Sequence, residues 1–232
     1  MDSWARLNGE IVSCTRCPRL RTHCEDIARV KRRAFRDQTY WGRPVPGFGD
    51  TEARVLLCGL APAAHGANRT GRMFTGDDSG HWLYAALHRA GFANQATAID
   101  GDDGLLLRDA FTTASARCAP PDNMPSAAEL AACAPFLDRE LALLARVRVV
   151  VALGQIAWTT IVGRARLVDA ASVPSPRPVF GHGAETKVRI RADASPVVLL
   201  GCYHPSRQNT NTGRLTRAML DAVLQRAAHL AE

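Results

Sequence analysis

The chain has 232 residues, a formal charge of +7 and 47% hydrophobic residues. It has no apolar run as long as a membrane span, and its first residues lack the apolar stretch of a signal peptide. We therefore expect a cytoplasmic protein with no membrane segment. A basic balance is typical of proteins that bind a polyanion such as nucleic acid, although it also suits an ordinary basic enzyme.

The first fifty residues read as an irregular basic arm that ends in the Pro/Gly-rich stretch WGRPVPGFGD. Positive charge is densest at Arg29, Lys31, Arg32, Arg33 and Arg36. Such a run indicates either a solvated helix face or a docking site for an anion, and the sequence alone favours the solvated face.

Four short apolar runs follow and predict buried strands at residues 54–60, 105–113, 148–153 and 197–203. Helical patterns separate them: one from near Gly80 to Gly91, one opened by a capping box of Ser126 and Glu129, and two at residues 155–162 and 216–231. Residues 172–194 are rich in Pro and Gly and predict a hairpin excursion. The alternation predicts one α/β domain over residues 1–232, with three αβα layers around a mainly parallel four-stranded sheet.

In such sheets, ligands bind beyond the carboxyl ends of the strands. Three loops lie there: residues 60–80, residues 114–124, and the stretch HPSRQNTNTGRLT after the fourth strand. The topology predicts that these loops converge on one site.

Two of these stretches, GLAPAAHGANRTGRMFTGD and CYHPSRQNTNTGRLT, resemble the active-site motifs of family 5 (type-B) uracil-DNA glycosylases. CTRCPRL, YWGRPVPGFGD, RCAPPDN and FGHGAE extend the likeness over most of the chain in the expected order. The resemblance implies a monofunctional DNA glycosylase that excises uracil from double-stranded DNA, and a monomer suits an enzyme that scans DNA. Uracil-strict relatives have a bulky aromatic residue where this chain has Ala63 or Ala64, so we expect a roomier pocket that also accepts other deaminated bases such as hypoxanthine. The alternative is an iron–sulfur DNA-binding protein that recognises damage without excision.

The cysteines suggest a metal centre. Their spacing alone suits either zinc or an iron–sulfur cluster. The resemblance implies a [4Fe–4S] cluster that ties the N-terminal arm to the domain, with Cys14, Cys17, Cys118 and Cys133 as ligands. Cys24 is then a spare thiol near the cluster, while Cys58 and Cys202 lie in apolar runs and read as core residues.

The resemblance also assigns the chemistry. It implies that His204 donates a hydrogen bond to the oxygen of the departing base and that Asp77 orients water and stabilises the sugar cation. The neighbouring Asp78 reads as the cap of the following helix, although either aspartate suits a helix start. Many related enzymes carry a carboxylate or amide at positions matching Leu60 or Ala61, so this chain lacks that group.

The remaining expected site residues fall into two groups. For base binding, the resemblance implies that the extruded base stacks on Phe74. Further candidates are Gly59, Ala63, Ala64 and His65 of the same motif, and Asn123 of RCAPPDN. For DNA binding, the resemblance implies the loop after His204, with an apolar wedge at Leu215 and polar contacts from Ser206, Arg207, Gln208, Asn209 and Arg214.

Overall fold

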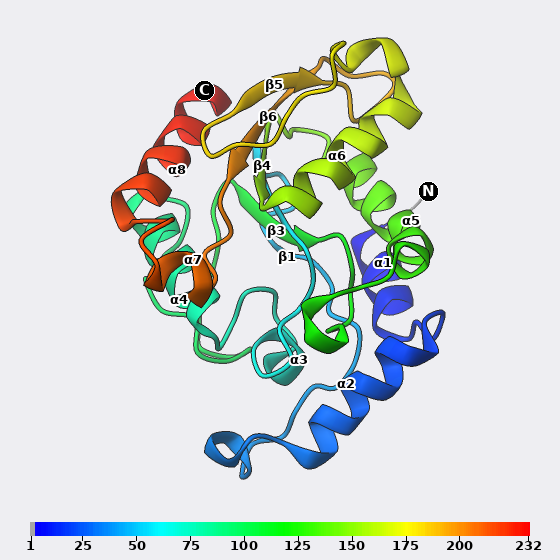
Figure 1. Ribbon diagram of the computed structural model, residues 1–232, viewed down its shortest axis with the longest axis vertical. Coiled ribbons are helices and arrows are strands. Elements are labelled where there is room, and N and C mark those ends of the chain that lie inside the picture. The colour runs from blue at the N-terminus through cyan, green and yellow to red at the C-terminus, as the bar shows by residue number, and fades with distance from the viewer. Residues whose placement is uncertain (1–2) are drawn as a thin grey trace.

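A computed structural model describes residues 3–232 and shows one mixed sheet between two layers of helices (Figure 1). Its strand order is β1-β3-β2-β4-β6-β5, where the strands are β1 (Phe48–Gly49), β2 (Val55–Gly59), β3 (Ala110–Ala114), β4 (Val149–Leu153), β5 (Glu185–Val188) and β6 (Val197–Cys202). The inner four strands are parallel, and β1 and β5 pair antiparallel at the two edges.

The prediction of a four-stranded sheet was therefore wrong in number, although the four predicted strands form its parallel centre. The two added strands leave little signal in the sequence. β1 has two residues, and β5 is a short edge strand with two exposed side chains rather than an apolar run. Residues 172–194 were predicted to form a hairpin of their own, but they contain a single strand, β5, which pairs with β6 outside that stretch.

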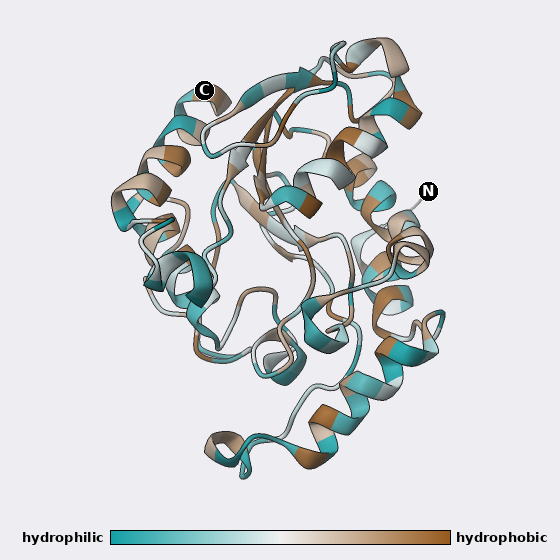
Figure 2. Cartoon of the chain, viewed as in Figure 1, coloured by the Kyte–Doolittle hydropathy of each residue, from teal (hydrophilic) through white to brown (hydrophobic). Residues whose placement is uncertain are grey.

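Both faces of the central strands are buried, so β2 and β4 read as continuous apolar runs, whereas β3 includes two buried threonines. Val55 and Leu57 of β2 pack with α4 (Asp78–Arg89) and α8 (Arg217–Ala231), whereas Leu56 and Cys58 pack with α5 (Ala127–Leu143) and α6 (Gln155–Val168). Figure 2 shows the hydrophobic residues concentrated on the strands and the inner helix faces. The predicted capping box of Ser126 and Glu129 is confirmed at the start of α5.

The N-terminal arm is mostly helical rather than irregular, which corrects the prediction. It contains α1 (Trp4–Val12), α2 (Pro18–Val30) and a 3-10 turn, η1 (Arg33–Phe35). In α1, Leu7 and Ile11 lie four residues apart and pack against Phe136 of α5. In α2, Leu20 and Cys24 repeat that spacing. The many charges of α2 hid this narrow apolar stripe.

The other short elements follow the strands at one edge of the sheet. They are α3 (Ala67–Thr70), α7 (Arg207–Asn211) and the 3-10 turn η2 (Pro121–Asn123); a third turn, η3 (Ala170–Ser172), follows α6. Within residues 3–232, every helix is too short or too polar to cross a membrane.

Candidate active site

A cavity of 320 Å³ opens at the carboxyl ends of the parallel strands, where the three predicted loops meet. That volume suits a small ligand such as one nucleobase. Its lining residues come from the loop after β2, from the start of α4, from η2 and from the loop after β6: Leu60, Ala61, Pro62, Ala63, Met73, Phe74, Asp77, Ser79, Asn123, His204, Ser206 and Gln208.

A larger hollow of 580 Å³ lies between the ends of α5 and α6, on the other side of the molecule. Three of the four charged residues that line it, Asp138, Arg164 and Arg191, already have partners within the fold. Arg164 pairs with Asp138, and the Arg191 guanidinium donates to backbone carbonyls at the end of α5. The cavity at the strand ends is the better candidate for chemistry because its ionisable groups converge without pairing.

His204 lies on one wall of this cavity, directly after β6. The side-chain amide of Asn209 donates to the His204 carbonyl at 2.8 Å and fixes the turn into α7, whose N-cap is Ser206. Burial lowers the pKa of His204 to about 4. At neutral pH the imidazole is therefore uncharged, with one ring nitrogen able to donate a hydrogen bond to a group in the cavity.

Asp77 lies in the same cavity and is also the N-cap of α4. Its Oδ1 accepts the Gly80 N–H at 2.8 Å, and a Cβ atom added at Gly66 would lie 2.2 Å from its Oδ2. Burial raises the pKa of Asp77, and the Gly80 N–H opposes that shift. The prediction that Asp78 caps the helix was therefore wrong. Asp78 lies in the first turn of α4, where it pairs with Arg207.

The Phe74 ring occupies the space that a side chain at residue 59 would need. A Cβ atom at Gly59 would lie 2.6 Å from the Phe74 ring, so Gly59 belongs to the site as the place where the ring meets the backbone. Phe74 itself has a φ of 53°, a strained value for an aromatic residue. The His204 ring lies 6.4 Å away, centre to centre.

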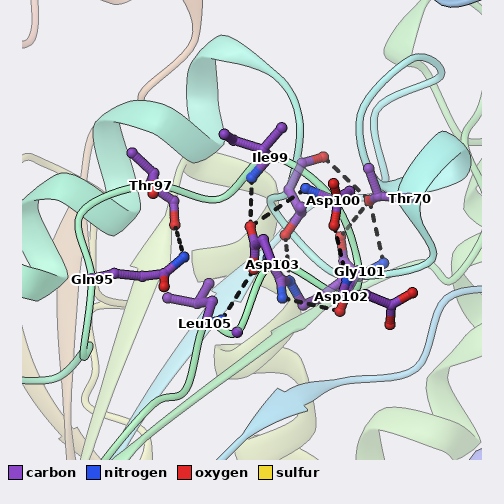
Figure 3. A network of polar contacts seen from close by, with 12 residues as sticks. Thr70, Gln95, Thr97, Ile99, Asp100, Gly101, Asp102, Asp103 and Leu105 are labelled. Atoms are coloured by element: carbon purple, nitrogen blue, oxygen red, sulfur yellow. Dashed lines mark hydrogen bonds and ion pairs between the residues drawn. The ribbon is translucent and has the colours of Figure 1, made fainter.

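Buried polar contacts hold the Phe74 loop in this strained shape. The Tyr84 hydroxyl donates to the Met73 carbonyl at 2.8 Å, and Arg72 donates to the Thr75 hydroxyl at 2.9 Å. Arg72 also pairs with Asp103 at 2.7 Å. Figure 3 shows how Asp103 is held in turn: its carboxylate accepts the backbone N–H groups of Ile99 and Leu105.

The other expected base-binding residues separate into two sets. Ala63 and Asn123 line the cavity, with Asn123 held at a φ of 56° in η2. Ala64 and His65 do not line it. Ala64 packs against the group of Leu20, Cys24 and Cys118. His65 lies beside Tyr40, with 3.1 Å between Nδ1 and the phenol oxygen, and burial lowers its pKa.

The loop after His204 presents polar rather than apolar groups. Leu215, expected as a wedge, is 0% exposed and packs in the core beside α4 and α8, so it anchors the loop instead. Ser206 and Gln208 line the cavity, while Arg207 is paired with Asp78. The exposed Arg214 guanidinium lies 4.8 Å from the centre of the Tyr203 ring.

The four expected ligand cysteines surround a second, small cavity together with Arg21 and Arg117. The Arg117 N–H donates to the Cys133 sulfur at 3.3 Å, and Cys24 and burial raise the pKa of Cys118. Within residues 3–232, no three His, Cys, Asp or Glu side chains are spaced to hold a single metal ion. Arg21 Nη1 and Arg117 Nε and Nη1 are buried without a hydrogen-bond partner. Sequence reasoning missed both arginines, although Arg117 directly precedes Cys118.

Comparison with known proteins identifies the family of the chain. The model of the "Uracil DNA glycosylase superfamily" matches residues 46–228. A type-5 uracil-DNA glycosylase of Mycobacterium tuberculosis is 53% identical over 230 residues, covering 99% of this chain and 82% of that protein. The type-5 enzyme of Thermus thermophilus is 49% identical over 221 residues, covering 95% of each chain.

The chain belongs to the type-5 family of uracil-DNA glycosylases. Likeness to the type-4 family is more limited: a type-4 enzyme of Pyrobaculum aerophilum is 33% identical over 118 residues, half of this chain. As a uracil-DNA glycosylase, the chain hydrolyses an N-glycosidic bond. The alternative of a protein that recognises damage without excision is therefore set aside.

Proposed function

We propose that this chain is a monofunctional glycosylase that hydrolyses uracil and other deaminated bases, hypoxanthine included, from double-stranded DNA during base excision repair. The observation that carries the proposal is one cavity that holds a neutral imidazole, a buried carboxyl group and an aromatic ring on its walls. Each group matches one requirement of breaking a bond between a sugar and a base.

The bond breaks with its electron pair moving to the base, which leaves an oxocarbenium-like sugar. The extruded base stacks on Phe74, and His204 donates to the oxygen on which negative charge develops. Asp77, as a carboxylate, stabilises the sugar cation and orients a water molecule. The water oxygen bonds to the sugar carbon, and its proton leaves to the carboxylate or to solvent.

The lining of the cavity favours hydrolysis over a lyase mechanism. A lyase step requires an amine that forms a Schiff base with the sugar. The chain has only two lysines, Lys31 and Lys187, and neither lines the cavity. We therefore expect the base to be released and the DNA strand to stay intact.

The same lining supports broad base selection. Leu60, Ala61, Pro62 and Ala63 form an apolar wall that offers no side-chain hydrogen bond to the base. A site discriminates strongly when a wrong base leaves its buried polar groups unpaired. The uncharged polar side chains on the lining are those of His204, Asn123, Gln208 and the two serines. Because the apolar wall holds no polar group that a different base would leave unpaired, hypoxanthine should be accepted.

We also propose a [4Fe–4S] cluster with Cys14, Cys17, Cys118 and Cys133 as its ligands. Four thiolates with a cluster carry net negative charge. Arg21 and Arg117 line that cavity with positive charge, and Arg117 also pairs with Glu140 at 2.6 Å. When bound, the group serves as a crosslink between the start of α2, the loop after β3 and α5. Iron and sulfide analysis of brown purified protein tests this, and a colourless, fully active zinc protein would contradict it.

A base-release panel tests the main proposal. Duplexes that carry uracil, hypoxanthine, xanthine or thymine are incubated with the enzyme, and base and strand are quantified separately. We expect release of uracil and hypoxanthine without nicking until heat or alkali is applied. Nicking that accompanies release at neutral pH would contradict the hydrolytic mechanism, and a strict preference for uracil would contradict the account of the apolar wall.

A further inference from the structure

The basic segment, residues 29–43, lies between α2 and β1 and concentrates the charge of the chain. It holds a single acidic residue, Asp37, and six basic ones: Arg29, Lys31, Arg32, Arg33, Arg36 and Arg43. Arg29 pairs with Asp26 at 2.7 Å. Within residues 3–232, the exposed side chains of Arg32, Arg33 and Arg36 make no hydrogen bond and no ion pair.

The backbone of this segment is fixed by its own contacts. The Lys31 ammonium donates to the carbonyls of Arg36 at 3.2 Å and Gln38 at 2.7 Å, which closes the loop around η1. The Arg32 N–H donates to the Tyr40 hydroxyl at 3.4 Å. The one lysine of the segment therefore stabilises the loop, while the side chains of Arg32, Arg33 and Arg36 project from a backbone that these contacts hold in place.

A buried arginine connects the basic segment to the catalytic loop. Arg69 of α3 is 6% exposed; its guanidinium lies 4.1 Å from the centre of the Phe35 ring and donates to Gln38 Oε1 at 2.6 Å. The same guanidinium donates to the carbonyls of His65 and Gly76, each at 2.9 Å. Gly76 directly precedes Asp77, so the basic segment and the catalytic carboxylate share one support.

Two further contacts hold the segment against this loop. The Tyr40 hydroxyl lies 3.1 Å from His65, and the Trp41 N–H donates to the Arg69 carbonyl at 2.9 Å. Figure 1 shows the segment beyond α3, at one end of the molecule. Through Arg69, the segment contacts the same loop that carries Ala63, Phe74 and Asp77 on the cavity lining.

We infer that the basic segment is a second DNA-binding surface, on which Arg32, Arg33 and Arg36 bind backbone phosphates on the flank of the extruded nucleotide. This inference rests on the proposed function only in that DNA is the substrate. DNA is the polyanion that must cover the mouth of the cavity. A guanidinium that neutralises a phosphate releases counterions, and a fixed backbone lowers the entropy lost when the phosphate binds.

The salt dependence of binding to an undamaged duplex tests the inference without requiring excision. The test variant is Arg32→Ala/Arg33→Ala/Arg36→Ala in the full chain. The matched control is Arg146→Ala/Arg166→Ala/Arg177→Ala, which removes the same charge from exposed arginines around the opposite edge of the sheet and the end of α6. Thermal unfolding verifies that both variants fold.

Each phosphate contact contributes about 0.9 to the slope of log K against log salt concentration. We expect the test variant to lose about 2 to 3 from that slope, and the control to keep the wild-type value. If both variants gave the same slope of log K against log salt concentration, the inference would be wrong, and the segment would be an ordinary solvent-exposed surface. The base-release panel on wild-type enzyme judges the proposed function separately.

Neutral backbone linkages locate the contact. Methylphosphonates are placed one at a time along both strands of a uracil duplex, and wild-type affinity falls at each phosphate that the protein binds. We expect the linkages on one flank of the uracil to lose this effect in the test variant and to keep it in the control. An unchanged profile in the test variant would contradict the inference, because it would show that Arg32, Arg33 and Arg36 bind no particular phosphate and add only to the overall positive charge.

Discussion

Gly66→Ala is the sharpest perturbation of the active site, because it acts on Asp77 without changing a reacting group. The three heavy atoms nearest to a Cβ at residue 66 all belong to Asp77, and Oδ2 is the closest at 2.2 Å. The Gly80 N–H holds Oδ1 at 2.8 Å, so the carboxylate cannot simply rotate away. It must retreat by about 1 Å, and a displacement of that size lowers a catalysed rate by about 10²-fold.

The assay is single-turnover uracil release with enzyme in excess over a fluorescent duplex. Gly163→Ala is the matched control, because a Cβ at that position in α6 meets nothing within 4 Å. We expect the control to keep the wild-type rate and Gly66→Ala to lose about two orders of magnitude. A wild-type rate in Gly66→Ala, with folding verified by thermal unfolding, would refute the claim that the position of Asp77 matters.

Three further predictions concern charge at the site. Burial raises the pKa of Asp77, so the rate of uracil release should fall as pH drops through a value above 3.8, and Asp77→Asn should remove this acid limb from the pH–rate profile. The folded-state pKa of His204, about 4, lies below its value of about 6.5 in the unfolded chain, which therefore binds the extra proton between these values. Wild-type stability should fall by about 2 kcal/mol between pH 7 and pH 5 through this group, and urea unfolding of His204→Asn should lack that component. Asp78→Asn releases Arg207 from its ion pair, so the salt slope of DNA binding should steepen by up to about 1, and an unchanged slope would show that Arg207 does not reach phosphate.

The parallel centre of the fold was predictable because its strands are buried on both faces and most of them read as apolar runs. The edge strand β5 was not, because half of its side chains face solvent and its pairing depends on β6 rather than on its own pattern. The helices of the arm were hidden for a related reason. Two buried residues per helix, such as Leu20 and Cys24, are a weak signal among many charges.

The site was predictable as a set of loops, since parallel strands deliver their carboxyl ends to one edge. Which side chains of a loop face the cavity depends on backbone angles that a sequence does not show. His65 and Phe74 illustrate this: the first lies beside Tyr40, and the second reaches the cavity through a positive φ. Leu215 lies in a polar loop, yet the start of α8 draws it into the core.

The geometry of the cavity gives a physical reason why the chain can lack an acidic side chain at residues 60 and 61. Leu60 and Ala61 line the cavity at the positions where the resemblance led us to expect an acid or an amide, so this part of the lining is apolar. A second carboxylate facing the same cavity would repel Asp77 and raise its pKa further, which would oppose its ionised form at neutral pH. Among the described lining residues Asp77 is the one acid, so a single carboxylate can stay charged opposite an uncharged imidazole. The apolar wall and the aspartate are therefore one arrangement: the wall adds no second acid, and Asp77, placed at the N-terminus of α4, supplies the single negative charge.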